Sequence, residues 1–386
     1  MKIALLTTDN REHQRTYGEK TPRFGPAIEA LLQGLATIAE LEIHVIACTQ
    51  RPMHAPEKLS DNTWFHLLHV PKIGWLRTGY QGCVRAIRRK LRELQPDLVH
   101  GEGTERECAL SAAFSGFPNV VTIHGNMRQV AKALAAGPGS YPWCAAKLES
   151  FVLPRTRGIF CNSAYTEALV APRAQRTWRV PNALRRVFLD TEPAPSTAAG
   201  KPILLNIGAV VSYKGQNEIL EIARELHLRS LNFELHFVGA ANRRDNYAAT
   251  FLDRMHDAEK AGFARYLGEQ SVEQLIALMD RASGLIHLAS EESFGLVVAE
   301  GLARNLKFFG STAGGVPDIA NDVEGAQLFP LGNEGQVIEA VARWLECGAP
   351  RPTTAAGEMK MRYHPDVIAQ EHFEIYNHLL GSAGQQ

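Results

Sequence analysis

The chain has 386 residues, of which 45% are hydrophobic and 21% are charged, and its formal net charge at pH 7 is zero. This length exceeds what one compact core usually holds, so it predicts two globular domains. The neutral total and the lack of a recognition motif argue against nucleic-acid binding. No apolar stretch approaches the roughly 20 residues that span a bilayer.

Strand-like and helix-like segments alternate through the first half of the chain. We expect strands at Lys2–Thr7, Glu42–Ala47, Phe65–Val70, Asp97–His100, Asn119–Ile123 and Gly158–Cys161. We expect helices at Pro26–Ala39, Tyr80–Leu94, Arg106–Phe114, Pro142–Leu153 and Ala164–Val170. Apolar strands alternating with amphipathic helices predict an α/β domain with a doubly wound parallel sheet over residues 1–190.

The stretch Glu192–Pro202 is rich in Pro, Ala and small polar residues, which predicts an interdomain linker. A second α/β domain follows over residues 201–366. Its expected strands are Ile203–Ile207, Glu234–Val238, Ala264–Leu267, Leu285–Leu288, Lys307–Phe309 and Gln327–Phe329. Its expected helices are Gln216–Leu228, Ala248–Ala261, Ser271–Arg281, Leu296–Arg304 and Glu334–Glu346. The amphipathic segment Val367–Leu380 predicts a last helix.

The cysteines indicate a reducing compartment. All six (48, 83, 108, 144, 161 and 347) are scattered without a Cys-x-x-Cys pair, which argues against disulfides and a zinc site. The apolar run at the start of the chain is too short for a signal-peptide core. We therefore expect a cytoplasmic protein.

Charge is divided unevenly along the chain. Residues 1–190 carry 25 Lys and Arg against 16 Asp and Glu, a net of +9, and residues 191–386 carry 16 against 25, a net of −9. Two domains that attract each other, a basic half that approaches an anionic acceptor or membrane, and chance variation all fit.

The helix at 80–94 places four arginines on one face, near apolar side chains. The arginines are Arg85, Arg88, Arg89 and Arg92, and the apolar residues are Trp75, Leu76 and Tyr80. Such a face either contacts anionic lipid or is solvated. Peripheral contact with the inner face of a membrane is therefore one expectation.

Two successive strand-to-helix turns carry the most informative residues. Glu292 lies between the strand-like run 284–289 and the helix at 296–304, and Glu300 lies eight residues later on that helix. Gly314 and Gly315 follow the next strand and open another helix. Such turns form a ligand crevice at the carboxyl edge of a parallel sheet, where free backbone N–H groups suit phosphate. Because the carboxylates accept hydrogen bonds from hydroxyls, the turns predict a nucleotide-sugar site.

This arrangement resembles the retaining, nucleotide-sugar-dependent glycosyltransferases of family 4 (glycosyltransferase group 1). Glu292 and Glu300 match the family's two glutamates separated by seven residues, and Phe294-Gly295 follows the first, as is usual in the family. The resemblance implies the GT-B fold: two Rossmann-like domains facing across a cleft, with the C-terminal helix (367–386) crossing back to the first domain.

The resemblance also implies roles for the residues of this stretch. Glu292 would contact the transferred sugar, and Glu300 would hydrogen-bond the ribose hydroxyls. Phe294, Gly295 and Leu296 would belong to the donor site.

A lysine follows the first strand of the second domain. The segment 203–215 resembles the family's Gly-Arg-(x)4-Lys-Gly element, whose arginine and lysine hold the donor diphosphate. Gly208, Lys214 and Gly215 match, and glycines there let the backbone approach the ligand closely. The resemblance places Lys214 among the catalytic residues.

Ala209 occupies the position of the family's arginine. One missing charge-assisted contact is worth about 1.5–3 kcal/mol. Arg243 and Arg244, just after the strand that leads to Gly239, are candidate substitutes, and Gly239 is expected at the donor site. A weakened or inactive site is the other interpretation.

His124 follows the strand at 119–123 in the first domain. It resembles the family's strand ending in Thr-x-His, whose histidine contacts the donor sugar near the reaction centre; a structural role is the alternative. Gly25 matches one of two glycines that the family places before its first helix, where the helix N-terminus faces the diphosphate. Pro26 replaces the second glycine and removes one backbone donor.

The resemblance as a whole implies transfer of a sugar from a nucleoside-diphosphate sugar to an acceptor hydroxyl with retention, catalysed by His124, Lys214 and Glu292. No cofactor or metal is expected. The acceptor is a glycan, a lipid or a small molecule, contacted through segments 8–23 and 126–141; disorder is the alternative for 8–23.

Two other functions stay open. Ala209, Pro26 and Asn305, where the family prefers glycine, motivate a non-catalytic nucleotide-sugar binder. A related GT-B nucleotide-sugar epimerase is the other alternative.

Overall fold

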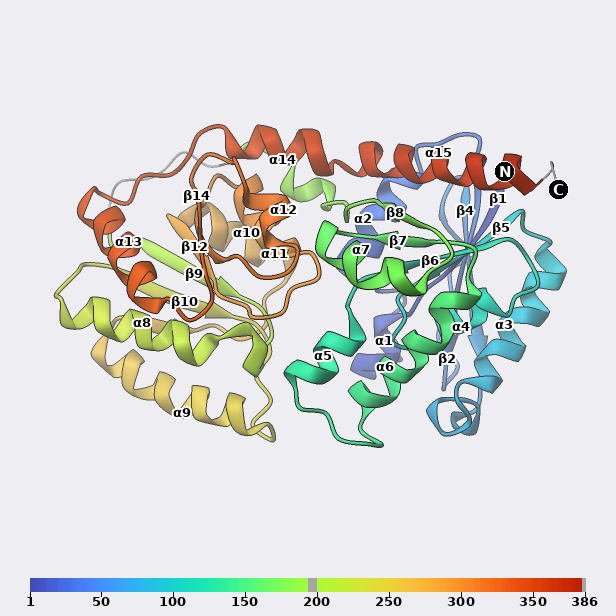
Figure 1. Cartoon of the computed structure of the whole chain (residues 1–386), viewed down its shortest axis with the longest axis horizontal. Helices are drawn as coiled ribbons and strands as arrows, with labels where there is room; N and C mark the ends of the chain where they lie inside the picture. Colours follow the sequence, from blue (N-terminus) through green and yellow to red (C-terminus); the bar gives the residue numbers. More distant parts are fainter. Residues whose placement is uncertain (194–199, 384–386) are drawn as a thin grey trace. The chain divides into compact units, whose positions relative to one another are not determined.

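The computed structural model describes residues 1–193 and 200–383, and the chain divides into two compact units (Figure 1). Unit 1 comprises Met1–Arg186 and the chain from Tyr363 onward, and unit 2 comprises Val187–Arg362. The expected domain ends at 190 and 366 lie a few residues beyond these boundaries. Within the expected linker, residues 194–199 lie outside the described residues.

Unit 1 is built on an eight-stranded sheet in the order β3-β4-β2-β1-β5-β6-β7-β8. Neighbouring strands are parallel except β3 and β4, which pair antiparallel at one edge. The strands are β1 Lys2–Leu6, β2 Glu42–Thr49, β3 Lys58–Ser60, β4 Thr63–His69, β5 Leu98–Glu102, β6 Asn119–Ile123, β7 Ile159–Cys161 and β8 Thr177–Arg179. Along β1, Ile3 and Leu5 enter one hydrophobic core, and Ala4 and Leu6 enter another. Because successive side chains point to opposite faces, both faces of this sheet are buried.

Unit 1 also contains helices (Figure 1), most of which supply side chains to its two cores. They are α1 Asn10–Gln14, α2 Pro26–Leu35, α3 Gln81–Leu94, α4 Glu107–Ala113, α5 Met127–Ala133, α6 Tyr141–Val152, α7 Ala164–Val170 and α15 Pro365–Ala383. The C-terminal helix α15 packs directly on α2. A Cβ atom at Gly34 would lie 2.1 Å from the carbonyl oxygen of Pro365, so the two backbones meet only because residue 34 is glycine.

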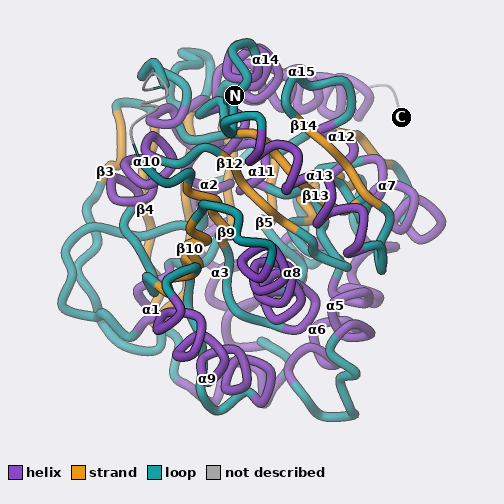
Figure 2. Tube along the Cα trace, turned by 90° about the vertical axis from the view of Figure 1, so that its left-hand side faces the viewer, coloured by secondary structure: helices purple, strands orange, loops and turns teal. Residues whose placement is uncertain are grey.

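Unit 2 contains a six-stranded, fully parallel sheet in the order β11-β10-β9-β12-β13-β14. The strands are β9 Ile203–Ile207, β10 Glu234–Val238, β11 Ala264–Tyr266, β12 Gly284–His287, β13 Lys307–Ser311 and β14 Ala326–Phe329. The helices are α8 Gln216–Leu228, α9 Asn246–Ala261, α10 Val272–Arg281, α11 Leu296–Ala303, α12 Val316–Ala320, α13 Glu334–Glu346 and α14 Ala355–Tyr363. Figure 2 shows the strands between layers of helix.

The predicted fold class, α/β with two Rossmann-like domains, is confirmed by these two sheets. The sequence did not predict α1, α5, α14, β3 and β8, and all of these except α14 have at most seven residues. A helix or strand of a few residues contains too few positions to show a periodic apolar pattern.

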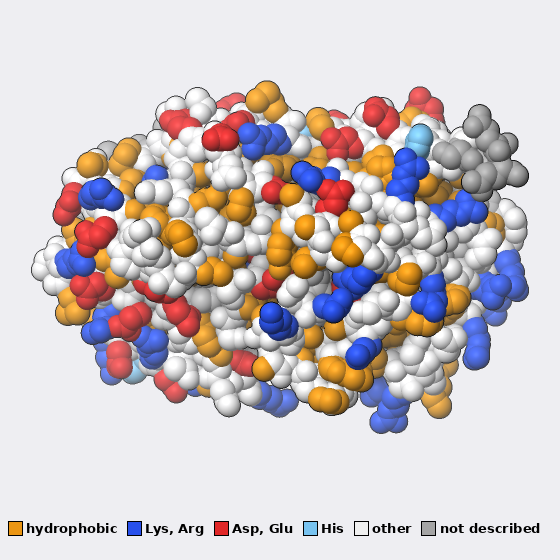
Figure 3. All heavy atoms as spheres, in the orientation of Figure 1, with side chains coloured by type: hydrophobic (Ala, Val, Ile, Leu, Met, Phe, Trp, Pro, Cys, Tyr) orange, Lys and Arg blue, Asp and Glu red, His pale blue; other side chains and the backbone are white. Residues whose placement is uncertain are grey.

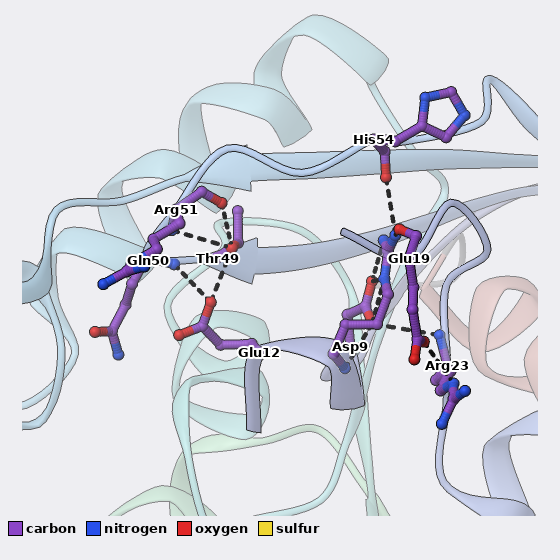
Figure 4. Close-up of polar contacts among 9 residues, drawn as sticks. Asp9, Glu12, Glu19, Arg23, Thr49, Gln50, Arg51 and His54 are labelled. Carbon is purple, nitrogen blue, oxygen red and sulfur yellow. Dashed lines mark hydrogen bonds and ion pairs between the residues drawn. The ribbon is translucent and has the colours of Figure 1, made fainter. Parts of the chain in front are cut away.

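The segment 8–23, for which disorder was the alternative, is ordered by a buried arginine. Arg11 donates to both carboxylate oxygens of Asp9, at 2.6 Å through Nη2, and both side chains are fully buried. Its Nη1 also donates to the carbonyl oxygens of Glu19 and His54, at 2.8 and 3.0 Å (Figure 4). These contacts tie the segment to itself and to the chain after β2.

A second carboxylate fixes the same segment to the end of β2. Glu12, which is 8% exposed, accepts hydrogen bonds from Oγ1 of Thr49 at 2.9 Å and from the backbone N–H of Gln50 at 3.0 Å (Figure 4). The segment is therefore a structured part of the sheet's carboxyl edge.

Replacing Arg11 with methionine should destabilise the protein by about 3–5 kcal/mol, because the substitution leaves the carboxylate of Asp9 buried without its partner. Chemical denaturation measures this free energy. The matched control is Arg243→Met, which breaks an ion pair with Asp253 whose side chains are 69% and 73% exposed and should cost at most about 1 kcal/mol. Equal effects from the two substitutions would contradict this account.

Candidate active site

The carboxyl ends of β9 and β12 meet at the centre of the unit 2 sheet. The chain runs outward from β9 through β10 to β11, then returns to β12 on the other side of β9. Parallel α/β sheets bind ligands where the strand order reverses in this way. Lys214 lies in the turn after β9 and Glu292 in the turn after β12, so the fold brings the two residues together.

Lys214 and Glu292 form a largely buried ion pair. Nζ of Lys214 donates to Oε2 of Glu292, and the two side chains are 18% and 14% exposed. Gly215, with φ of 71°, turns the chain from Lys214 into α8. The two turns are also joined through the backbone, since the N–H of Ser290 donates to the carbonyl oxygen of Tyr213 at 2.8 Å.

His287, the last residue of β12, is a second partner of Glu292. Its Nε2 lies 3.0 Å from Oε2 of the carboxylate, and its side chain is 2% exposed. Burial alone would raise the pKa of Glu292, but the charge of Lys214 and the hydrogen bond with His287 lower it to about 2. Burial lowers the pKa of His287. At neutral pH the site therefore holds a carboxylate, an ammonium group and a neutral imidazole that donates through Nε2.

The glycine turn after β13 fixes the backbone of Glu292. The N–H of Gly315 donates to the carbonyl oxygen of Glu292 at 2.8 Å. Gly314 has φ of 60°, and a Cβ atom there would lie 1.8 Å from the same oxygen. Only glycine fits this position, so the two predicted turns lie side by side as expected.

The residues predicted around the start of α11 differ in exposure. Phe294 and Glu300 are 3% and 6% exposed, and Gly295 has φ of 106° at the helix N-cap. Leu296, the first helical residue, is half-buried. Val297, the next residue, is half-buried as well. The donor roles of these residues stay predictions.

Gly208 and Gly239 meet where β9 and β10 end. A Cβ atom at Gly239 would lie 2.1 Å from the carbonyl oxygen of Gly208, so the two turns are in direct contact. Ala209 follows with an exposed side chain, and its carbonyl oxygen accepts from Nε2 of Gln216 at 3.0 Å. Arg243, a candidate substitute for the missing arginine, instead forms the exposed ion pair with Asp253 described above.

Arg244, the other candidate substitute, is exposed. A pocket of about 240 Å³ lies within unit 2 beside these turns. Gly215, Tyr213, Ser290 and Asn333 are among its lining residues, whereas Lys214 and Glu292 do not line it.

In unit 1, His124 contacts a buried glutamate that the sequence analysis did not single out. His124 follows β6, and Glu102 ends the neighbouring strand β5; Nε2 of the histidine lies 2.8 Å from Oε2 of the carboxylate. The side chain of His124 is 24% exposed, while that of Glu102 is fully buried. Burial would lower the pKa of His124, but the hydrogen bond and the charge of Glu102 raise it overall. Burial would raise the pKa of Glu102, but His100 and His124 lower it to about 2.

The contact continues from Glu102 to the C-terminal helix. Nε2 of His100 lies 3.3 Å from Oε1 of Glu102, and its Nδ1 lies 2.6 Å from the hydroxyl of Tyr376 on α15. His100 and Tyr376 are fully buried, and burial lowers the pKa of His100 to about 4. A continuous set of polar contacts therefore joins α15 to His124.

Gly25 is the N-cap of α2, and Pro26 is the first residue of that helix. Its φ is −66°, which any residue adopts, and a Cβ atom there would meet nothing within 4 Å. The local fold thus does not require glycine at this position.

One group of potential metal ligands occurs among residues 1–193 and 200–383. It consists of Cys48, Cys83 and Glu107, whose ligand atoms lie within 4.8 Å of one another. All three are buried, and both cysteines belong to a hydrophobic core of unit 1.

Two protein-family models match the chain. The model of glycosyl transferases group 1 matches residues 190–358, and the model of Glycosyltransferase Family 4 matches residues 27–185. The chain is a glycosyltransferase. The group 1 match lies in unit 2 and the Family 4 match lies in unit 1, and together they cover most of the chain.

Solved structures show that this glycosyltransferase has the GT-B fold. Sucrose-phosphate synthase from Thermosynechococcus elongatus superposes with a TM-score of 0.74 at 16% identity, covering 99% of this chain and 100% of that one. HepE from Anabaena, in complex with UDP and glucose, gives a TM-score of 0.70 at 15% identity, covering 98% of this chain and 99% of that one. The lipopolysaccharide outer core galactosyltransferase WaaB gives a TM-score of 0.66 at 15% identity, covering 97% of this chain and 99% of that one. A search of curated proteins gives no match.

Within the described parts of the glycosyltransferase, no helix has both the length and the apolar character that crossing a membrane requires.

Substituting Glu102 with glutamine should lower the pKa of His124, because the neutral amide removes the charge that offsets burial of the imidazole. NMR titration of the histidine ring signals measures this pKa. Glu57→Gln, at an exposed position of unit 1, is the control and should leave it unchanged. A pKa of His124 that does not respond to Glu102→Gln would remove the carboxylate as the cause of the shift.

The same substitution should alter acid stability. The pKa of Glu102 in the folded protein is about 2, below its ordinary 4.5, so its contribution to stability is present above that ordinary value and is lost as pH falls toward 2. Denaturation curves should therefore show a smaller loss of stability over this pH range for Glu102→Gln than for the wild type.

Proposed function

We propose that this glycosyltransferase moves a hexosyl-type sugar from a nucleoside-diphosphate sugar to an acceptor hydroxyl with retention of anomeric configuration. The observation that carries the proposal is the ion pair of Lys214 and Glu292 at the reversal of strand order in unit 2. The ammonium group suits a diphosphate, and the carboxylate suits sugar hydroxyls. Structures of the similar HepE contain UDP and UDP-glucose, which supports a nucleotide-sugar donor here.

In the free enzyme, Lys214 and Glu292 hold each other in place. A donor diphosphate would compete with the carboxylate for the ammonium group, and His287 would keep Glu292 in position when Lys214 turns toward the phosphates. The pair is thus a preorganised charge arrangement, in which little reorientation is needed during the reaction.

In this proposal, the reaction proceeds by front-face displacement, which retains the anomeric configuration without an enzymatic nucleophile. The bond from the anomeric carbon to the diphosphate oxygen breaks as the bond to the acceptor oxygen forms on the same face. The departing diphosphate oxygen takes the proton of the acceptor hydroxyl, which yields a nucleoside diphosphate and the glycoside. Lys214 and the backbone N–H groups at the starts of α8 and α11 offset the charge that develops on the leaving group.

Two parts of the proposal rest on the resemblance. His124 would contact the transferred sugar, and Glu102 would keep its imidazole oriented. Catalysis would need no metal, because Lys214 supplies the positive charge that a divalent ion provides elsewhere.

We also propose a cytoplasmic location with peripheral membrane contact.

A non-catalytic nucleotide-sugar binder is the second candidate, and the exposed Ala209 at the place of an arginine favours it. Asn305 does not favour it: its φ of 54° suits asparagine, and its Oδ1 accepts from the N–H of Ala356 at 2.8 Å. Pro26 fits the first helical position without strain. Incubation with UDP-, GDP- and ADP-sugars separates the candidates, since an enzyme releases nucleoside diphosphate and a binder does not.

Changing Glu292 to alanine should reduce sugar transfer by about 100-fold or more, because the sugar loses a positioned hydrogen-bond acceptor. Release of nucleoside diphosphate from the preferred donor measures the rate, and circular dichroism checks the fold. The control is Glu346→Ala, at an exposed position at the end of α13. Turnover that is unchanged in Glu292→Ala would remove this residue from the mechanism.

Introducing arginine at Ala209 should tighten nucleoside-diphosphate binding about tenfold or more if the site lacks one phosphate contact. The side chain of residue 209 is exposed, so the larger group fits without repacking. Calorimetry with UDP, GDP and ADP measures the affinity, and Ala209→Met controls for side-chain length without charge. Equal affinities for the arginine and methionine variants would show that another group already supplies the contact.

A further inference from the structure

A pocket of about 640 Å³ lies in unit 1, apart from the residues proposed for catalysis. It is bounded by the end of β4, by two 3₁₀ turns (Lys72–Gly74 and Leu76–Thr78) and by the first half of α3. Its polar lining includes His69, Thr78, Arg85 and Arg89. None of the proposed functions uses this pocket.

Apolar side chains project from the turns beside the pocket. Ile73, which lines it, is 72% exposed, and Leu76 is 45% exposed. Neither exposure results from a loose loop, because Trp75 between them is 5% exposed and its Nε1 donates to the carbonyl oxygen of Val70 at 2.9 Å. The fold thus holds two large apolar side chains in solvent.

The turns are also fixed to α3 by two glycines. A Cβ atom at Gly82 would lie 2.5 Å from Cα of Gly74, so the first 3₁₀ turn contacts the helix backbone directly. Tyr80, expected beside the arginine face as an apolar neighbour, is instead 4% exposed and packs edge-on to Trp75.

Arginines of α3 lie beside these turns, and Arg85 and Arg89 line the pocket together with Ile73. Arg85, Arg88, Arg89 and Arg92 are exposed at the i, i+3, i+4 and i+7 positions of α3. Within residues 1–193 and 200–383, no ion pair involves these four side chains, whereas their neighbour Lys90 pairs with Glu93 at 3.1 Å. Like charges at these spacings repel one another, so an anionic partner would relieve the repulsion. Figure 3 shows Lys and Arg side chains gathered at the right of the view, over α3.

We infer that this surface docks onto a membrane that contains anionic phospholipid. The surface consists of Lys72, Ile73, Leu76, Arg77, Arg85, Arg88, Arg89 and Arg92. Ile73 and Leu76 enter the boundary between headgroups and acyl chains, and Arg85 and Arg89 hold a lipid phosphate in the pocket. Exposed apolar groups beside unpaired cations match an anionic lipid, which offers both kinds of partner in one layer.

The inference specifies the membrane contact of the proposed function, but it does not depend on the donor site. Unit 1 carries the surface, whereas Lys214 and Glu292 belong to unit 2. Donor hydrolysis in solution therefore tests the proposed function separately from the membrane contact.

Co-sedimentation of the full chain with vesicles tests the inference, using phosphatidylcholine alone and phosphatidylcholine mixed with phosphatidylglycerol. The wild type should bind the mixed vesicles, bind neutral vesicles at least tenfold more weakly, and lose affinity as salt rises. Ile73→Glu/Leu76→Glu and Arg85→Glu/Arg89→Glu should each weaken binding at least tenfold while leaving donor hydrolysis unchanged. The controls Leu228→Glu and Arg157→Glu, at exposed positions elsewhere, should bind as the wild type does.

Three results would overturn the inference. They are no vesicle binding by the wild type, equal binding to both kinds of vesicle, and unchanged binding by the two double variants. Inorganic phosphate that protects the wild type against thermal unfolding as strongly as mixed vesicles do would assign the pocket to a soluble anion. A wild-type protein that binds another protein through this surface but not vesicles would likewise overturn it.

Discussion

The ion pair between Lys214 and Glu292 is the interaction on which the site in unit 2 depends. Each residue follows a different strand, and the strands are neighbours only because the chain returns to the middle of the sheet after β11. Burying one of these charges alone would be costly, so each stabilises the other in the free protein. The same geometry places a cation and a hydrogen-bond acceptor at the point where parallel sheets bind ligands.

Neighbouring groups keep this pair in one arrangement. His287 contacts the carboxylate of Glu292, and the turn at Gly314 and Gly315 fixes its backbone. Unit 1 contains a similar arrangement. Glu102 contacts and orients His124, and His100 connects Glu102 to Tyr376 on α15. In each unit, a candidate catalytic residue contacts a buried side chain for which no ligand contact is proposed. The pairs are Glu292 with His287 and His124 with Glu102.

The sequence predicted Lys214, Glu292 and the glycine turns because these features are local. A glycine after an apolar strand, followed by a helix, places its neighbours at the carboxyl edge of a sheet whatever the rest of the chain does. The helix and strand limits were predicted closely for the same reason, as β9, β10 and α8 show. By contrast, the short α1 and the ordered segment 8–23 depend on Arg11, whose partner His54 lies on a distant loop.

The partners of the catalytic candidates could not be predicted in this way. His287 and Glu102 are polar residues at the last positions of their strands, and Tyr376 contacts His100 although 276 residues separate them in the sequence. Only tertiary pairing shows which buried polar groups face each other. The exposure of Ile73 could not be predicted either. Trp75 and Tyr80, a few residues later, are buried, and the sequence alone does not distinguish these apolar side chains from Ile73.

A crystal structure with a bound nucleoside diphosphate would test the central claim most directly. The account predicts that Nζ of Lys214 lies within hydrogen-bonding distance of a diphosphate oxygen, while Glu292 stays in contact with His287. A diphosphate bound elsewhere, with the pair of Lys214 and Glu292 intact, would contradict it.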